Sequence, residues 1–217
     1  MPRSDAVAQP EAPRDCPLCP RLVAYRAANA AANPTWFNGP APSWGDADAR
    51  LLVAGLAPGR TGANRTGRPF TGDHAGWLLY ATLKTAGFAT GTYDPNGADD
   101  LRLIDCLITN AVRCAPPGNK PETSEENNCR PFLASRIAAL PRLKVIVTLG
   151  DVSRRNVLKA LGLKASAGQP GHGTEFRAGP YVVLNSYHCS RLNTNTGRLT
   201  PAMFEAVFDR ARALLDG

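Results

Sequence analysis

The sequence has 217 residues, 43% of them hydrophobic, and carries a formal net charge of +7 at pH 7. This length suits one domain with a sizeable core. No apolar run approaches the roughly 18 residues that span a bilayer. The N-terminal segment lacks the apolar stretch of a secretory signal. We therefore expect a cytoplasmic protein without membrane association. The excess of lysine and arginine suits a polyanionic partner, although a solvated basic surface explains it equally well.

The chain begins with a segment that predicts no structure. Residues 1–14 are rich in proline, alanine and charge and are expected to form a disordered tail, which leaves a single domain over residues 15–217. A helix is predicted over 20–32, where Ala, Leu and Arg are frequent. A loop rich in glycine, proline and tryptophan follows over 33–48.

Four apolar runs then predict strands buried on both faces of a parallel sheet, because each is short, nearly continuous and rich in β-branched residues. The runs are Arg50–Gly55, Leu103–Val112, Leu143–Gly150 and Tyr181–Tyr187. A helix is expected after each run: over 73–87, from a capping box at Thr123–Glu126, over 151–161 before Gly162, and from the N-cap Thr200 to residue 215. The alternation predicts an α/β fold, a three-layer sandwich with a central, mainly parallel four-stranded sheet flanked by helices.

Ligands of such sheets bind beyond the carboxyl ends of the strands. The loop after the first strand is rich in glycine, which lets backbone N–H groups approach a phosphate or a base edge, but it contains neither a dinucleotide fingerprint nor a P-loop. At its end, Asp73 suits a helix cap and a catalytic carboxylate about equally. Phe70 is either a core residue or a ring that stacks on a flat base.

Polar residues also follow the second and fourth strands. The Asn110 amide offers one acceptor and two donors, which suits a pyrimidine edge, although bonding to loop backbone is the commoner role. His188 at the end of the fourth strand is a candidate catalytic group, although a lone histidine is more often structural. Arg191 and Arg198 are natural phosphate contacts or, alternatively, solvated loop residues.

The six cysteines divide by context. Cys106 lies inside the second strand and is expected in the core, while Cys189 suits either a spare or a pocket residue. Four others lie in loops or at helix ends, where thiolates suit an iron–sulfur cluster or tetrahedral zinc, and their spacing does not distinguish the two. These four are Cys16, Cys19, Cys114 and Cys129.

Together these segments resemble the uracil-DNA glycosylase superfamily, in its family 5 or type B branch, from Cys16 to the last helix. Three motifs carry the resemblance: Gly55-Leu-Ala-Pro58, Thr66-Gly-x-x-Phe70-Thr-Gly-Asp73, and His188 followed by Asn193-Thr-x-Thr-Gly197. Type A relatives have a glutamate in place of Leu56 and no aspartate matching Asp73. The resemblance implies a monomer that acts on DNA containing uracil, hypoxanthine, xanthine or other deaminated bases, and leaves an abasic site for base-excision repair.

The resemblance also implies roles for single residues. Phe70 and Asn110 would bind the extruded base together with backbone amides near Gly55 and Ala57. Asp73 would stabilise the sugar cation and orient a water molecule, and His188 would donate to the base. Phosphate and gap contacts would come from the loop that contains Arg191, Asn193, Gly197 and Arg198. A [4Fe–4S] cluster would be held by Cys16, Cys19, Cys114 and Cys129.

Two other classes of protein fit part of the sequence. A zinc-stapled nucleic-acid-binding module accounts for the charge and the four cysteines, but not for polar residues at the ends of three strands. A redox or radical enzyme would use a cluster, but the clustered C-x-x-x-C-x-x-C pattern of a radical enzyme is absent. No lysine occurs in the three motifs, so a glycosylase of this kind would not form a Schiff base and would leave the DNA strand uncut.

Overall fold

The structure, a computed structural model, describes residues 10–217. Its central sheet has six strands in the order β1-β5-β2-β6-β8-β7. The four inner strands are parallel: β2 (Leu51–Gly55), β5 (Cys106–Asn110), β6 (Val145–Leu149) and β8 (Tyr181–Ser186). The predicted α/β class and the four parallel strands are therefore confirmed.

The sheet has six strands rather than the four that were predicted, because a short antiparallel strand closes each edge. These are β1 (Trp44–Gly45) and β7 (Glu175–Ala178). The first has only two residues within the expected loop, and the second is a half-exposed segment with two charged side chains. Strands β1 and β7 lack the length and the continuous apolar pattern from which a buried strand can be predicted.

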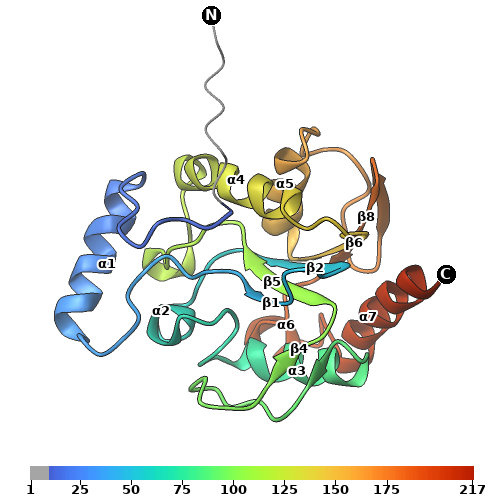
Figure 1. The fold of residues 1–217 in the computed structure, drawn as a ribbon, viewed down its shortest axis with the longest axis horizontal. Coiled ribbons are helices and arrows are strands. Elements are labelled where there is room, and N and C mark those ends of the chain that lie inside the picture. The colour runs from blue at the N-terminus through green and yellow to red at the C-terminus, as the bar shows by residue number, and fades with distance from the viewer. Residues whose placement is uncertain (1–9) are drawn as a thin grey trace, which may run out of the picture.

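Helices cover both faces of the sheet, with α4 and α5 on one side and α3 and α7 on the other (Figure 1). The helices are α1 (Pro20–Ala32), α2 (Ala63–Thr66), α3 (His74–Thr85), α4 (Thr123–Ala138), α5 (Asp151–Ala160), α6 (Arg191–Asn195) and α7 (Pro201–Asp216). A 3₁₀ turn spans Pro117–Asn119, and β3 (Ala89–Thr90) pairs with β4 (Arg102–Leu103) in a small second sheet. Within residues 10–217, no helix combines the length and the apolar character needed to cross a membrane.

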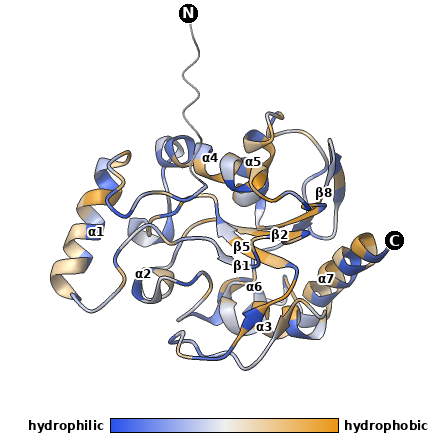
Figure 2. Cartoon of the chain, in the orientation of Figure 1, coloured by the Kyte–Doolittle hydropathy of each residue, from blue (hydrophilic) through white to orange (hydrophobic). Residues whose placement is uncertain are grey.

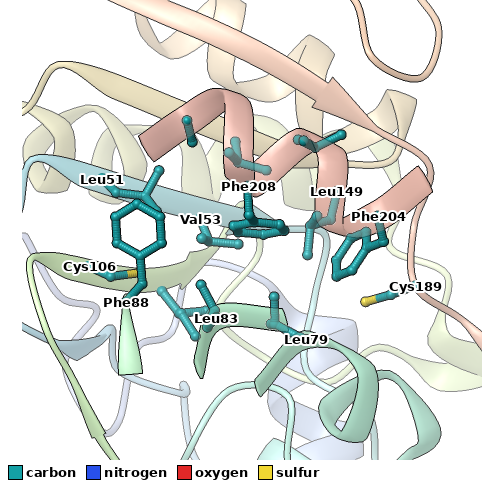
Figure 3. Close-up of a cluster of buried hydrophobic side chains, with 14 of the residues drawn as sticks. Leu51, Val53, Leu79, Leu83, Phe88, Cys106, Leu149, Cys189, Phe204 and Phe208 are labelled. Atoms are coloured by element: carbon teal, nitrogen blue, oxygen red, sulfur yellow. The ribbon is translucent and has the colours of Figure 1, made fainter. Parts of the chain in front are cut away.

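Successive residues of β2 enter different cores, as expected for a strand covered on both faces. Leu51 and Val53 pack toward α3 and α7, whereas Leu52 and Ala54 pack toward α4 and α5. The inner strands are mostly hydrophobic, whereas hydrophobic and hydrophilic residues alternate along helices such as α7 (Figure 2). Figure 3 shows Phe204 and Phe208 of α7 in the first of these cores.

Two predicted boundaries are wrong, each for a local reason. The apolar run predicted over 103–112 is interrupted at Asp105, whose φ of 54° is left-handed and whose carboxylate accepts from the Arg50 N–H at 2.8 Å. Consequently Leu103 pairs in the small second sheet. The predicted capping box at Thr123 and Glu126 lies one residue earlier: α4 has Glu122 as N-cap, and the Glu125 side chain accepts from the Glu122 N–H at 2.8 Å.

The expected tail over residues 1–14 falls partly outside the described residues, which begin at residue 10. For residues 10–14 the structure differs from the prediction, because Glu11 forms ion pairs with Arg113 and Arg136. The Glu11 carboxylate also accepts from the Ser43 N–H at 3.0 Å. These contacts attach the segment to the loop after β5 and to α4 through charges that composition alone does not reveal.

Candidate active site

A cleft of about 630 Å³ lies at the carboxyl edge of the parallel sheet. The segments after β2, β5 and β8 form its walls, as expected for an open α/β sheet. Its lining residues are Leu56, Ala57, Pro58, Gly59, Arg60, Thr61, Gly62, Ala63, Phe70, Gly72, Asp73, His74, Ala75, Asn110, Asn119, His188, Ser190 and Arg191. Six residues singled out from the sequence therefore meet in one place: Ala57, Phe70, Asp73, Asn110, His188 and Arg191.

Asp73 is the N-cap of α3, and its Oδ1 accepts from the Gly76 N–H at 3.1 Å. The Asp73 side chain is exposed at the cleft, and the protein groups around its carboxylate displace part of its hydration. This desolvation raises the pKa of Asp73, while N–H donors at the start of α3 act in the opposite direction. Asp73 is thus both a cap and a cleft carboxylate, so the two readings from the sequence are compatible.

Phe70 has a left-handed backbone with φ of 55°, which is strained for a residue with a bulky side chain. Two tyrosines hold the strained segment: Tyr93 Oη donates to the Phe70 carbonyl at 3.1 Å, and Tyr80 Oη donates to the Pro69 carbonyl at 2.6 Å. Burial raises the pKa of Tyr93 to about 12, so its hydroxyl keeps the proton that it donates. The Phe70 ring is therefore fixed at the cleft.

Gly55 lies beneath the site rather than on its wall. A Cβ atom at this position would stand 2.4 Å from Asn110 Oδ1 and 2.7 Å from Phe70 Cζ. Only glycine lets the amide and the ring approach the strand backbone this closely. Asn110 is 3% exposed, and within residues 10–217 its side chain has no hydrogen-bond partner. A buried amide without a partner at a cleft is available to a ligand.

His188 is the second residue after β8, and its ring stacks toward Phe70 with 6.1 Å between ring centroids. Burial lowers the pKa of His188, so the neutral imidazole is favoured. The Asn193 amide donates to the His188 carbonyl at 2.7 Å. The loop thereby presents a neutral ring to the same cleft as the Asp73 carboxylate.

The predicted DNA-binding residues divide between two neighbouring clefts. Arg191 lines the first, whereas Asn193 and Arg198 line a second cleft of about 430 Å³ that shares His188 with it. Gly197 lines neither cleft and has φ of 71°, which the turn after α6 requires. Leu192 at the start of α6 is 72% exposed. Leu192 was not among the predicted site residues, although an isolated apolar residue in a polar loop is a signal that could have identified it.

Other cleft residues were also missed. His74, which follows Asp73, lines the cleft and lies 3.0 Å from Thr194 Oγ1 through Nε2. Arg60 lines it too, with its Nε donating to Asn29 Oδ1 at 3.0 Å. Arg60 lies in the glycine-rich loop and His74 at the start of the helix that follows it. Neither the type nor the spacing of these two residues distinguishes them from neighbouring polar residues that face solvent.

The four loop cysteines line one small pocket away from the cleft, between the start of α1, the segment after β5, and α4. Three of their sulfurs face N–H donors: Arg26 Nη1 at 3.6 Å from Cys114 Sγ, Asn128 Nδ2 at 3.7 Å from Cys19 Sγ, and the Arg113 N–H at 3.2 Å from Cys129 Sγ. Among the described residues, no three His, Cys, Asp or Glu side chains are placed to hold one metal ion.

The two remaining cysteines are buried in the core between α3, α7 and the sheet (Figure 3). The expectation for Cys106 is confirmed. Cys189, left open by the sequence, is buried as well, with its Sγ 3.6 Å from the Ala75 carbonyl. Burial raises the pKa of both thiols far above the usual range, so they are neutral apolar side chains.

Comparison with known proteins agrees with this geometry. The family model of the uracil DNA glycosylase superfamily matches residues 42–212. The type-5 uracil-DNA glycosylase of Thermus thermophilus is 44% identical, over 92% of this chain and 93% of its own length. Proteins of the same name from Pyrobaculum aerophilum and Mycobacterium bovis are 40% and 41% identical over 92% of this chain, which covers 88% and 78% of their lengths.

The raised pKa of Asp73 predicts how its charge affects stability. At pH 7 the variant Asp73→Asn should melt at a higher temperature than the parent, because asparagine caps a helix equally well and carries no desolvated charge. Folding raises this pKa, so ionisation destabilises the fold as the pH rises from the unfolded pKa of about 3.9. The difference in melting temperature between Asp73→Asn and the parent should therefore vanish near pH 4. Melting curves of both proteins between pH 4 and pH 7 measure it.

Asp99 gives the matched control with the opposite sign. Hydrogen bonds from the Arg68 guanidinium lower the pKa of Asp99, so Asp99→Asn should melt below the parent at pH 7. The difference should shrink only below the unfolded pKa of about 3.9, as the pH falls through the lower pKa of the folded state. Loss of stability at pH 7 in Asp73→Asn would contradict the desolvation of Asp73.

Proposed function

The chain belongs to the uracil-DNA glycosylase superfamily, whose members are hydrolases of N-glycosyl bonds, and we propose that it releases uracil from DNA as a monofunctional glycosylase in base-excision repair. The observation that carries this proposal is the meeting of Phe70, Asn110, Asp73 and His188 in one cleft. These residues come from three separate segments of the chain. Together they supply a stacking ring, an amide, a carboxylate and a neutral imidazole.

The first step is capture of a base that has left the DNA stack. Phe70 would stack on the flat face of the base, supported by the rigid backbone at its position. The Asn110 amide, which has no partner within residues 10–217, would bond to the base edge. Ala57 lines the same cleft, and its N–H, which makes no backbone bond in the described part of the chain, would add a further donor.

Asp73 would act on the sugar. Cleavage of the bond leaves positive charge on the sugar and negative charge on the departing base, as in other oxocarbenium-like transition states. The Asp73 carboxylate would stabilise the cation and orient or deprotonate a water molecule. Its partial exclusion from bulk water strengthens the attraction to a neighbouring cation. Among the described residues, the cleft lining includes no lysine, which supports hydrolysis without a Schiff base and without strand cleavage.

His188 would act on the base. The lowered pKa keeps the ring neutral, so one nitrogen donates a hydrogen bond to the pyrimidine O2 as charge grows there. A neutral donor becomes more favourable as the negative charge develops, and this difference between ground state and transition state accelerates the reaction. Asp73 and His188 therefore stabilise the opposite charges that the same bond cleavage creates.

Hypoxanthine, xanthine and other deaminated or damaged bases are proposed as further substrates. The cleft lining includes small residues, among them Ala57, Gly59 and Gly62. A cleft of about 630 Å³ has space for a purine as well as a pyrimidine. Release of free hypoxanthine from a duplex that contains one deoxyinosine is the direct assay of this broader range.

The DNA backbone would lie along the loop after β8. Arg191 at the cleft and Arg198 beyond His188 would contact phosphates, with Asn193 and Gly197 shaping the turn between them. We place Leu192 in the gap that the extruded base leaves, because this exposed apolar side chain adjoins the cleft residue Arg191. Filling the gap would offset part of the unstacking energy.

A [4Fe–4S] cluster on Cys16, Cys19, Cys114 and Cys129 is the proposed cofactor. The donor set fits: four thiols converge on one pocket, and N–H groups face three of the sulfurs. When bound, the cluster would join the start of α1 to β5 and α4.

The catalytic role of Asp73 predicts a separation between binding and chemistry. Asp73→Asn should bind a uracil-containing duplex nearly as well as the parent, but its single-turnover release of uracil should fall by roughly ten- to a thousandfold. Asparagine keeps the helix cap and cannot supply the charge. Quantification of free uracil against time, with Asp209→Asn on α7 as control, provides the measurement. A rate near that of the parent in a folded Asp73→Asn variant would remove Asp73 from the chemistry.

The proposed phosphate contacts predict the salt dependence of DNA binding. Affinity should fall steeply as salt rises, and Arg191→Ala or Arg198→Ala should each reduce the slope of log K against log salt by about one unit. Arg142 precedes β6 at the opposite end of the sheet, so Arg142→Ala serves as the control and should keep the slope. Unchanged slopes in both loop variants would exclude these arginines from the interface.

The cluster predicts a coloured protein. Protein purified without oxidation should be brown, with broad absorbance near ~400 nm and four irons per chain, from a cluster held by four cysteines. Cys114→Ala should lose the colour, whereas Cys106→Ala should keep it, because Cys106 is buried in a separate core. A colourless, active protein with one zinc per chain would overturn the assignment.

A further inference from the structure

The orientation of the His188 ring depends on its main chain. Within residues 10–217 the imidazole has no hydrogen-bond partner, and its ring stacks on the Phe70 ring. On the C-terminal side, the His188 carbonyl is held by the Asn193 amide at 2.7 Å. What holds the N-terminal side therefore decides where the ring points.

That side is held by a second histidine from another part of the chain. The Tyr187 N–H, one residue before His188, donates to His172 Nδ1 at 3.2 Å. The opposite nitrogen, His172 Nε2, lies 3.1 Å from the Met203 carbonyl. His172 thus bridges the segment before β7, the end of β8 and the first turn of α7.

The Tyr187 N–H and the Met203 carbonyl determine the protonation state of His172, while the Ser186 hydroxyl, which can donate or accept, lies 3.4 Å from the same Nδ1. A backbone N–H can only donate, so Nδ1 must offer its lone pair, and a carbonyl can only accept, so Nε2 must carry the hydrogen. The ring is consequently neutral and in a single tautomer. Burial lowers the pKa of His172, which favours the same neutral form.

Packing adds to the hydrogen bonds. The rings of His172 and Tyr187 lie 5.3 Å apart between centroids at an interplanar angle of 31°, and the Arg198 guanidinium lies 4.5 Å from the Tyr187 ring centroid. Tyr187 is therefore in contact both with His172 and with an arginine proposed to meet DNA.

We propose that His172 is a positioning residue for His188, fixing the Tyr187 peptide so that the unpartnered His188 imidazole points into the cleft. The inference rests on the proposed function, in which His188 donates to the departing base. His172 itself is absent from the cleft lining and acts through the peptide that it holds.

A double-mutant cycle on single-turnover uracil release tests this role. His172→Phe keeps a ring against Tyr187 but removes the hydrogen bonds of the imidazole, and should slow release by roughly tenfold with DNA affinity within about twofold of the parent. In a His188→Ala background the same change should alter the rate by less than about twofold, because the ring that it positions is gone. His172→Gln, which again offers an acceptor and a donor, should recover part of the rate.

Thr174→Val provides the matched control, since Thr174 holds the same segment through Asn185 Nδ2 at 2.8 Å without touching Tyr187. His172→Phe could slow uracil release equally in the parent and in His188→Ala, or only as much as Thr174→Val does. Either result would show that the substitution merely loosens the segment, and would overturn the positioning role. A parent rate in His172→Phe would do the same. An inactive parent, or a His188→Ala variant as fast as the parent, would overturn the proposed function together with the inference.

Discussion

The Cα atom of Gly55 lies where three parts of the site approach one another. The Phe70 ring and the Asn110 amide both come so close to this atom that a single added carbon would overlap them. Asn110 is brought there by the parallel pairing of β2 with β5, which aligns Gly55 with Asn110 in register. Phe70 is brought there by a loop that accepts a left-handed backbone at a bulky residue. A glycine at the end of one strand thus permits the ring and the amide to form one surface.

Desolvation shifts the pKa values of two groups in the cleft, Asp73 and His188, in opposite directions. It raises the pKa of Asp73 and lowers that of His188, so each neutral form gains at the expense of the charged one. For His188 this shift agrees with the proposed role, which needs a neutral donor. For Asp73 it opposes the proposed role, which needs the anion. The carboxylate is therefore placed at a helix N-terminus, where the N–H groups of Ala75 and Gly76 favour its charge.

The sequence predicted those parts of the fold in which the apolar pattern of the residues matches their burial in the structure. β2, β6 and β8 are continuous apolar runs buried on both faces, and α1 was predicted with the observed bounds. The carboxyl-edge rule then led to Asp73, Asn110 and His188, which the structure brings together. Edge strands, the break at Asp105 and the attachment of Glu11 could not be predicted, because each depends on partners distant in the chain. The same holds for the tyrosines that support Phe70 and for His172.

The N-terminal segment and the cysteine pocket connect to the cleft through a buried polar chain. The Arg113 N–H donates to Cys129 Sγ at 3.2 Å, and the Arg113 side chain, 1% exposed, donates to Ser43 Oγ at 2.8 Å. Ser43 Oγ in turn lies 2.9 Å from Thr109 Oγ1, one residue before Asn110. A buried arginine needs a partner for its charge, and Glu11 at 3.2 Å supplies it. The cysteine pocket, the segment at residue 11 and the end of β5 therefore form one connected unit. Displacing any member would leave the Arg113 charge or a buried hydroxyl without its partner, next to the residue that faces the base.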